Sequence, residues 1–364
     1  MVSFSSLTGI YFVVDTFTNL DEFVRYGNET QGGLLAVLRD YYSPRILETF
    51  NYIGALLALI AAMFAIAWLR RSNELTALLA AGIPQSRILR PLILAALVVS
   101  AIGVAVREFG IPQVRAELSR NAQNWQGTVA KPVRPRYDNE TGIQINGRSA
   151  LMAKKEIVKP KFRLPGHLAE SFGRYLQAET AHFQAPTEGR RTGYLLTDVS
   201  KPENFSEMPS IQIDNQTVIF TPTDATWLKK NQCFVVSNVN FEQIASGAKW
   251  RDCSSTTELI QAIHNPSLEF GADVRVTIHS RFIRPFLDMT LIFLGLPLVA
   301  SRQPPNVFFA VGKCLCLVSA LMLITLVCHS MGNNGYLITP AMAAWLPLMV
   351  FAPIAYATSA NLRE

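Results

Sequence analysis

The sequence predicts an α-helical integral membrane protein with six transmembrane helices and an inserted all-β, jelly-roll-like extracytoplasmic domain. Three observations support this fold class. Apolar runs about as long as a bilayer is thick recur in both end regions of the 364-residue chain. A long segment with the composition of a soluble domain lies between them. Charged residues make up only 16% of the chain, against about 25% in soluble domains.

Five apolar runs are candidates for membrane spans, because crossing the hydrocarbon core needs about 20 mostly apolar residues. They are residues 46–69, 92–106 (extendable back to 89), 282–300, 307–328 and 337–357. Residues 2–17 form a weaker sixth candidate, which is short and contains Asp15. Either the sequence begins inside a helix whose first half is missing, or this segment is interfacial or re-entrant.

A short helix is predicted between the spans at 46–69 and 92–106. Ser72 or Asn73 is placed to cap its start, and Glu74 lies in its first turn, where a negative charge meets the positive end of the helix dipole. Gly82 follows the last helical residue, where a left-handed cap costs least. The pattern predicts a helix over residues 73–81.

The short loops determine the predicted orientation, because Lys and Arg in such loops favour the cytoplasmic side. The basic loops carry Arg70, Arg71, Arg87 and Arg90 in one case and Arg302 and Lys313 in the other. The loop at 330–336 has no Lys or Arg. Both chain ends and the short helix are therefore predicted to be cytoplasmic.

This orientation gives three predicted parts. Transmembrane helices 1–3 occupy residues 1–109, an external domain occupies residues 110–277, and transmembrane helices 4–6 occupy residues 278–364. The protein would then be a multi-pass membrane protein whose inserted domain lies on the side opposite the cytoplasm.

The external segment shows the two-residue alternation of strands with one buried face. Val, Ile, Tyr and Phe alternate with polar residues at 143–146, 175–179, 211–214 and 233–239. One helix is predicted over 256–263, with Ser255 or Thr256 as its cap. Antiparallel strands in a segment of this length predict a sandwich or jelly roll.

Motifs for catalysis are missing from the sequence. It contains no phosphate loop, metal-binding H-E-x-x-H helix, nucleophile elbow or paired C-x-x-C. We therefore predict no catalytic residue, no metal and no cofactor. The net charge of +6 is modest and the basic residues form no long run, so no nucleic-acid partner is predicted. Cys233 and Cys253 lie in the predicted external domain, either bridged or as free thiols.

The arrangement of three spans, a β domain and three more spans, together with the string ELTALLAAGI at residues 74–83, resembles the permeases of the lipopolysaccharide export ABC transporter, the YjgP/YjgQ type. The resemblance covers nearly the whole chain. Weaker matches lie at residues 108–112 and 279–285.

The resemblance implies a transport subunit and not an enzyme, located in the cell inner membrane as a multi-pass protein with a periplasmic domain. Two such permeases, identical or paralogous six-span chains, would pair and bind a cytoplasmic ABC ATPase dimer, which hydrolyses the ATP. They would extract a membrane glycolipid and pass it to a periplasmic jelly-roll bridge protein. The helix at 73–81 would be the coupling helix that contacts the ATPase. Its contact residues would be Glu74, Leu75, Leu78, Leu79 and Gly82. The alternative is an ordinary solvated connector.

The resemblance also implies a lateral gate between the first and fifth spans, roughly residues 7–23 and 307–328. Phe308, Phe309 and Leu315 would give that gate apolar surface for acyl chains.

Arginines near the outer ends of the spans are candidates for binding the glycolipid headgroup, because guanidinium groups match phosphate geometry. We expect Arg281 and Arg284 to form this site, with Arg107 and Arg115 adding charge at the same level. Interfacial anchoring is the alternative for each. Arg284 and Asp288 lie four residues apart on one helical face and are placed to pair.

Two functions of other classes stay open. One is a permease of another ABC exporter or a mechanotransmission system, which would typically have four spans. The other is a non-transport membrane scaffold or sensor whose β domain binds an envelope ligand.

Overall fold

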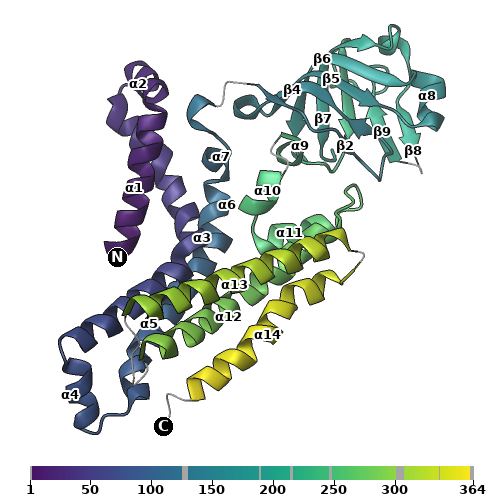
Figure 1. Cartoon of the computed structure of the whole chain (residues 1–364). Coiled ribbons are helices and arrows are strands. Elements are labelled where there is room, and N and C mark those ends of the chain that lie inside the picture. The colour runs from purple at the N-terminus through teal and green to yellow at the C-terminus, as the bar shows by residue number, and fades with distance from the viewer. Residues whose placement is uncertain are drawn as a thin grey trace. The chain divides into compact units, whose positions relative to one another are not determined.

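A computed structural model describes residues 2–124, 130–187, 190–213, 216–245, 248–300, 307–335 and 337–360. The chain forms two compact units (Figure 1). The helical unit comprises Met1–Val114 and Gly271–Glu364, and the sheet unit comprises Arg115–Phe270. The predicted boundaries lay at 109/110 and 277/278.

The first part of the helical unit is a series of helices and short turns. They are α1 (Val2–Thr18), α2 (Leu20–Glu29), α3 (Gly33–Arg71), α4 (Glu74–Ala80), α5 (Gln85–Ala105), the π-helical turn η1 (Val106–Gly110) and α6 (Ile111–Gln113). At 39 residues, α3 is longer than the apolar run within it, because it begins 13 positions before residue 46 and continues through Pro44.

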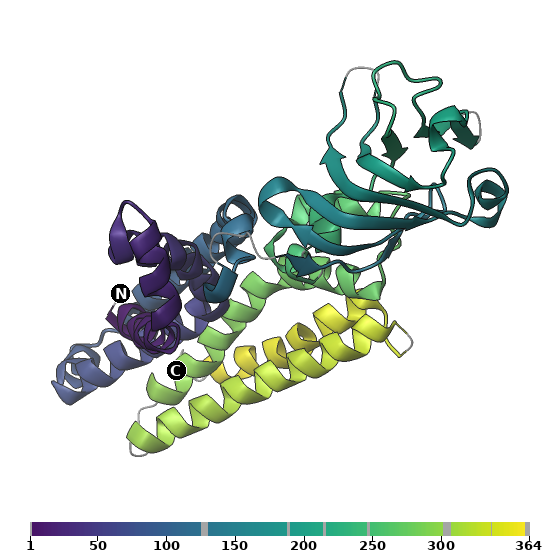
Figure 2. The same ribbon diagram turned by 90° about the horizontal axis from the view of Figure 1, so that it is seen from above.

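The second part consists of three long helices, α12 (Ala272–Ala300), α13 (Val307–Asn334) and α14 (Pro340–Ala360). They run side by side in both ribbon views (Figure 1 and Figure 2). One apolar cluster contains buried residues from α3, α4, α5, α12, α13 and α14, which ties both parts of the helical unit together.

A close helix crossing lies within this cluster. A Cβ atom on Gly295 of α12 would lie 2.5 Å from Cδ1 of Leu59 in α3 and 3.3 Å from Sγ of Cys314 in α13. The missing side chain of Gly295 therefore allows the three helices to approach one another.

Within the described residues, four helical segments are long and apolar enough to cross a membrane, at 33–71, 85–113, 312–334 and 340–358. These segments contain the predicted spans at 46–69 and 92–106 and overlap those at 307–328 and 337–357. The remaining two predicted spans correspond to α1, which has 17 residues, and α12, which carries Arg281, Arg284 and Asp288. For these two, membrane crossing stays a prediction.

The sheet unit is built on one ten-stranded antiparallel sheet, with strand order β1-β4-β5-β6-β7-β10-β9-β8. Strand β3 pairs with β2 and β5 at the side of this path. The strands are β1 (Lys131–Pro132), β2 (Arg136–Tyr137), β3 (Gln144–Ile145), β4 (Gly147–Leu151), β5 (Glu156–Arg163), β6 (Tyr175–Gln184), β7 (Gly193–Lys201), β8 (Ile211–Ile213), β9 (Gln216–Phe220) and β10 (Gln232–Val236).

Short helices connect and cover these strands. They are α7 (Arg115–Leu118), η2 (Ala122–Asn124), η3 (Met152–Lys154), α8 (Gly166–Phe172), η4 (Phe205–Glu207), α9 (Phe241–Ala245), α10 (Ala248–Cys253) and α11 (Thr256–Ile263). The predicted helix at 256–263 is confirmed with its cap. Ser255 Oγ accepts from the backbone N–H of Glu258, and the Glu258 carboxylate accepts from the N–H of Ser255.

The predicted strands are confirmed in part. Segment 175–179 lies in β6 and 211–213 is β8, segments 143–146 and 233–239 only overlap β3 and β10, and residue 214 lies outside the described residues. The expected alternation is absent in β10, where Cys233 to Val236 are all buried. The core of the unit contains the fully buried side chains of Ile145, Phe162, Leu176 and Tyr194. Cys233 and Cys253 are both buried and form no disulfide, so the bridged alternative is not realised.

Candidate functional site

The loop helix α4 is joined to α5 by a tight turn at its C-terminal end. Gly82 has a φ of +78°, a left-handed conformation that glycine adopts without strain. The N–H of Gly82 bonds to the carbonyl of Leu79 at 3.0 Å, and the N–H of Ile83 bonds to the carbonyl of Leu78 at 3.1 Å. This pair of bonds is a Schellman motif, so the predicted glycine cap is confirmed.

The predicted side-chain cap at the other end is wrong. Asn73 occupies the N-cap position but has a φ of 59° and makes no side-chain cap bond. Ser72 Oγ instead donates to the carbonyls of Trp68 and Leu69 in the last turn of α3. Only two residues separate α3 from α4, so both are used in the turn between the helices and neither caps α4 with its side chain.

The two faces of α4 have different surroundings. Leu75 is 5% exposed and belongs to the apolar cluster of the helical unit, and Leu79, one turn later, packs against that cluster. Glu74 and Gly82 are exposed, and Leu78 is half-buried. The helix is therefore anchored by Leu75 and Leu79 and presents Glu74 on its open surface.

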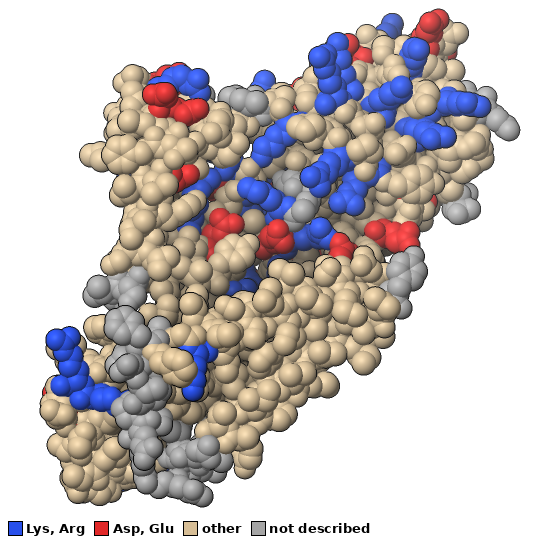
Figure 3. Space-filling model, in the orientation of Figure 1, with Lys and Arg blue, Asp and Glu red and all other residues tan. Residues whose placement is uncertain are grey.

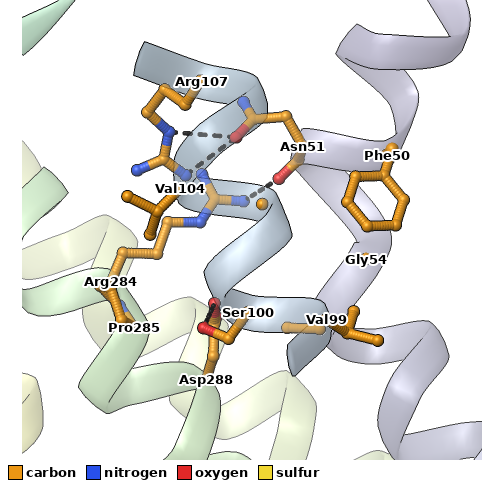
Figure 4. Close-up of a pocket in the computed structure, with 12 residues that line it drawn as sticks. Phe50, Asn51, Gly54, Val99, Ser100, Val104, Arg107, Arg284, Pro285 and Asp288 are labelled. Atoms are coloured by element: carbon orange, nitrogen blue, oxygen red, sulfur yellow. Dashed lines mark hydrogen bonds between the residues drawn. The ribbon is translucent and has the colours of Figure 1, made fainter. Parts of the chain in front are cut away.

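A polar cluster joins α3, α5 with its π-helical extension, and α12 (Figure 4). Arg107 in η1 is 8% exposed and donates from Nε and Nη2 to Oδ1 of Asn51 at 3.0 and 2.9 Å. Arg284 of α12 donates from Nη2 to the backbone carbonyls of Asn51 and, at 3.3 Å, Tyr52. Two arginines from different helices thus converge on the same turn of α3.

A second polar contact lies below this turn in Figure 4. Ser100 Oγ of α5 donates to Oδ2 of Asp288 of α12 at 3.3 Å. The residues of both contacts line a cavity of about 20 Å³, which has room for about one water molecule. Polar side chains are costly in an apolar helix bundle unless they find partners, and here each partner is on a neighbouring helix.

Arg107 lies where the helix geometry changes. The turn Val106–Gly110 is π-helical between the α-helical segments α5 and α6. A π-turn adds one residue to the helical repeat and is frequent at functional sites.

The expected pairing of Arg284 with Asp288 is wrong for the described residues. Arg284 reaches the carbonyls of α3 and Asp288 accepts from Ser100 of α5, because each side chain points to a different neighbouring helix. Arg281 is half-buried one turn before Arg284 and does not line the cavity.

Arg115 lies outside this cluster. It is part of the sheet unit, where its guanidinium pairs with Glu242 at 2.9 Å and with Glu258 at 3.0 Å. Two carboxylates of its own unit compensate its charge, and its expected contribution to a headgroup site stays a prediction.

The residues expected at the lateral gate lie on α13. Phe309 and Leu315 are exposed, and the side chain of Phe308 is outside the described part of the structure. Asp15 of α1, the unexpected charge in the first apolar segment, accepts a hydrogen bond from Tyr42 Oη of α3 at 2.9 Å and one from Asn19 Nδ2 at 3.2 Å. These bonds compensate the carboxylate and tie α1 to α3.

Two residues of the polar cluster were missed from the sequence, Asn51 and Ser100. Both interrupt apolar runs, at 46–69 and 92–106. A polar residue inside a span is itself a signal of a helix contact or a functional site, so Asn51 was detectable. Its partner was not, because that depends on how the helices pack.

The string ELTALLAAGI at 74–83 forms α4 and its glycine cap, next to a long apolar helix on each side. A comparison with protein families matches residues 1–152 and 179–361 to the family described as lipopolysaccharide export system permease LptF/LptG. No curated protein matches the chain. The family match covers nearly the whole chain, and the chain therefore belongs to the LptF/LptG family of lipopolysaccharide export permeases.

Proposed function

We propose that the chain is the permease subunit of an ABC transporter, which extracts lipopolysaccharide or a related glycolipid from the inner membrane and passes it to a periplasmic bridge protein. The family supports export of lipopolysaccharide. The observation that carries the ABC assignment is the difference between the two faces of α4. Leu75 is inserted into the apolar core, whereas the adjacent Glu74 is exposed.

This arrangement suits the transmission of movement. A partner that binds the exposed face of α4 through Glu74 pushes on a helix whose opposite face is packed into the core of α3, α5, α12, α13 and α14. Packed cores respond to such a push by rigid-body shifts and not by local bending. The partner would be a cytoplasmic ATPase dimer that presents a basic group to Glu74, and Leu78 and Gly82 complete the contact surface. Leu75 and Leu79 anchor the helix.

The substrate path is proposed within the helical unit and the sheet unit. Arg281 and Arg284, with Arg107 nearby, would meet the phosphates of the glycolipid headgroup. Arg284 donates to the α3 carbonyls through one nitrogen, Nη2. This contact does not use all of its donors, because a guanidinium carries five N–H groups. Phe308, Phe309 and Leu315 would form the acyl-chain side of a lateral gate with α1.

The assembly completes this proposal. In this proposal the chain has six spans, and its antiparallel sheet unit is a jelly-roll-like outlet in the periplasm. A second six-span permease, identical or paralogous, pairs with this chain, and a periplasmic jelly-roll bridge protein receives the glycolipid.

The test is purification of the chain in mild detergent, followed by identification of its partners and measurement of ATP hydrolysis with added lipopolysaccharide. We expect an ATPase and a second permease to co-purify. Glu74→Ala should abolish the stimulation of ATP hydrolysis, while Thr76→Ala, an exposed position on the same helix, should retain it. Purification without an ATPase, or full stimulation in the Glu74→Ala complex, would contradict the proposal.

A further inference from the structure

The sheet unit carries a group of basic, aromatic and amide side chains that the coupling mechanism does not use. Directly opposed residues of antiparallel strands point to the same side of a sheet. One row across β2, β3, β5 and β6 contains Tyr137, Gln144, Arg163 and Tyr175. The next row, across β5, β6 and β7, contains Lys161, Gln177 and Lys201. These seven residues are called the basic sheet face below.

The basic sheet face lies on the side of the sheet opposite the core. Phe162 and Leu176 are opposed between the two rows and are completely buried, so the residues on either side of them in the strands point outward. Tyr137 is 54% exposed and Tyr175 is 38% exposed. Lys161, Arg163 and Lys201 are exposed.

The basic sheet face is positively charged, since its seven residues include three cations and no acid. The nearest acids along β6 and β7, Glu179 and Asp198, lie beyond the second row. In the space-filling view, Lys and Arg side chains gather over the sheet unit (Figure 3). The Nζ of Lys161 lies 4.3 Å from the centre of the Tyr175 ring, so a cation and an aromatic surface are adjacent. Within the described residues, none of the three cations forms an ion pair.

We propose that the basic sheet face binds the phosphate-bearing oligosaccharide of the exported glycolipid. Guanidinium and ammonium groups pair with phosphate oxygens, and the amides of Gln144 and Gln177 donate to and accept from sugar hydroxyls. The tyrosine rings offer flat apolar surfaces for the C–H side of a sugar ring. Binding to an anionic membrane surface would need only the three cations. The face also carries two exposed tyrosines beside Arg163 and two amides, and these groups match a saccharide.

This inference rests on the proposed function for the identity of the glycolipid. It adds a separate binding site, outside the helical unit and on the outer surface of the sheet, for the part of the substrate that carries sugars and phosphates. The acyl chains need not contact this face.

The test uses the full-length chain in nanodiscs of neutral phospholipid. The probes are the oligosaccharide released from lipopolysaccharide by complete deacylation, with its phosphates, and the same oligosaccharide after removal of the phosphates. Binding is measured by isothermal titration calorimetry at two salt concentrations. We expect the phosphorylated probe to bind more tightly than the dephosphorylated one, with an affinity that falls as salt rises.

Two matched variants test the site. The double variant Lys161→Gln with Arg163→Gln should lower the affinity for the phosphorylated probe about tenfold. The control Lys229→Gln with Lys230→Gln removes two exposed positive charges elsewhere on the same unit and should leave the affinity unchanged. Tyr175→Ala should weaken binding of both probes, while Tyr175→Phe, which keeps the ring, should not. The thermal unfolding of each variant checks that the sheet is intact.

Equal losses in the two double variants would overturn the inference, as would equal affinity for the two probes. The inference would also be overturned if the double variant Lys161→Gln with Arg163→Gln lost only its binding to added vesicles of anionic phospholipid. The face would then be a membrane contact. The outcome is separable from the Glu74 experiment. If Glu74→Ala abolishes the stimulation of ATP hydrolysis but the chain binds no oligosaccharide, this inference alone is contradicted. If the chain binds the oligosaccharide but has no ATPase partner, the ABC transporter proposal alone is contradicted.

Discussion

The guanidinium of Arg107 and the side-chain amide of Asn51 join two different helices through two hydrogen bonds to one oxygen, at 3.0 and 2.9 Å. Arg107 is 8% exposed, so bulk water has little access to this contact. The backbone carbonyl of Asn51 also accepts from Arg284. This turn of α3 therefore connects α3 both to the π-helical turn after α5 and to α12.

Asn51→Leu should destabilise the helical unit, because it keeps the size of the side chain but leaves the charged Arg107 without its acceptor. The expected loss is about 3 kcal/mol of unfolding free energy. Asn51→Asp retains an acceptor for Arg107 and is the control. Thermal unfolding in mild detergent measures both. An unchanged melting temperature in Asn51→Leu would show that Arg107 finds another partner and that the contact does not hold the helices.

Gly82→Ala should weaken the connection between α4 and α5. No atom lies within 4 Å of the Cβ position at Gly82, so the cost is that of the left-handed backbone alone, about 1 kcal/mol. Gly82→Asn should cost less, because asparagine tolerates this conformation. Lipopolysaccharide-stimulated ATP hydrolysis of the purified complex is the measurement, and we expect the order glycine, asparagine, alanine. If asparagine and alanine behave alike, the backbone conformation is not what matters there.

Local signals in the sequence were sufficient for several elements. The start of the helix at 256–263 is determined by Ser255 and Glu258, three residues apart. The end of α4 is determined by Gly82, whose own backbone adopts the left-handed conformation. These two caps depend on residues that are close in sequence, so they could be predicted from the sequence alone. The side-chain cap expected from Ser72 or Asn73 could not, because both residues form the turn between α3 and α4.

Contacts between distant segments could not be predicted in this way. Asn51 and Arg107 are 56 positions apart, and nothing in the local sequence specifies which helix faces which. The basic sheet face depends on strand register, since Arg163 is opposed to Gln144 and Tyr175 only in the observed pairing. Hydrophobic alternation predicts which residues point outward but not which outward residues are neighbours.

Gly295→Ala should destabilise the crossing of α12 with α3. The added Cβ would lie 2.5 Å from Cδ1 of Leu59, a side chain that is almost completely buried and has little space to move. The expected cost is about 1 to 2 kcal/mol. Gly103→Ala, at a helical position with no atom within 4 Å, is the control and should be neutral or slightly stabilising.

A second substitution tests the cause of this effect. Leu59→Ala removes the atom that the new methyl group meets, so Gly295→Ala should cost less in the Leu59→Ala background than in the wild type. Thermal unfolding of the four proteins gives the coupling between the two positions. Additive effects would mean that the strain is not at this contact.

The last prediction concerns the thiols of the sheet unit. Cys233 is completely buried in β10, and burial raises its pKa well above the ordinary value, because the thiolate would lose its hydration. Since only the thiolate reacts, Cys233 should resist maleimide in the native protein. An unperturbed thiol, with a pKa of about 8.5, becomes at least about tenfold more reactive between pH 7 and pH 9. Labelling of Cys233 should instead stay slow across this range and become fast only after unfolding.

Peptide mapping by mass spectrometry, without added reductant, measures this labelling site by site. Cys253 is also buried and forms no disulfide, so it should react only in the unfolded chain. If Cys233 and Cys253 were bridged, neither would react after unfolding until reductant was added. Rapid native labelling of Cys233 would mean that β10 opens easily, and the sheet would then be too mobile to hold the register on which the basic sheet face depends.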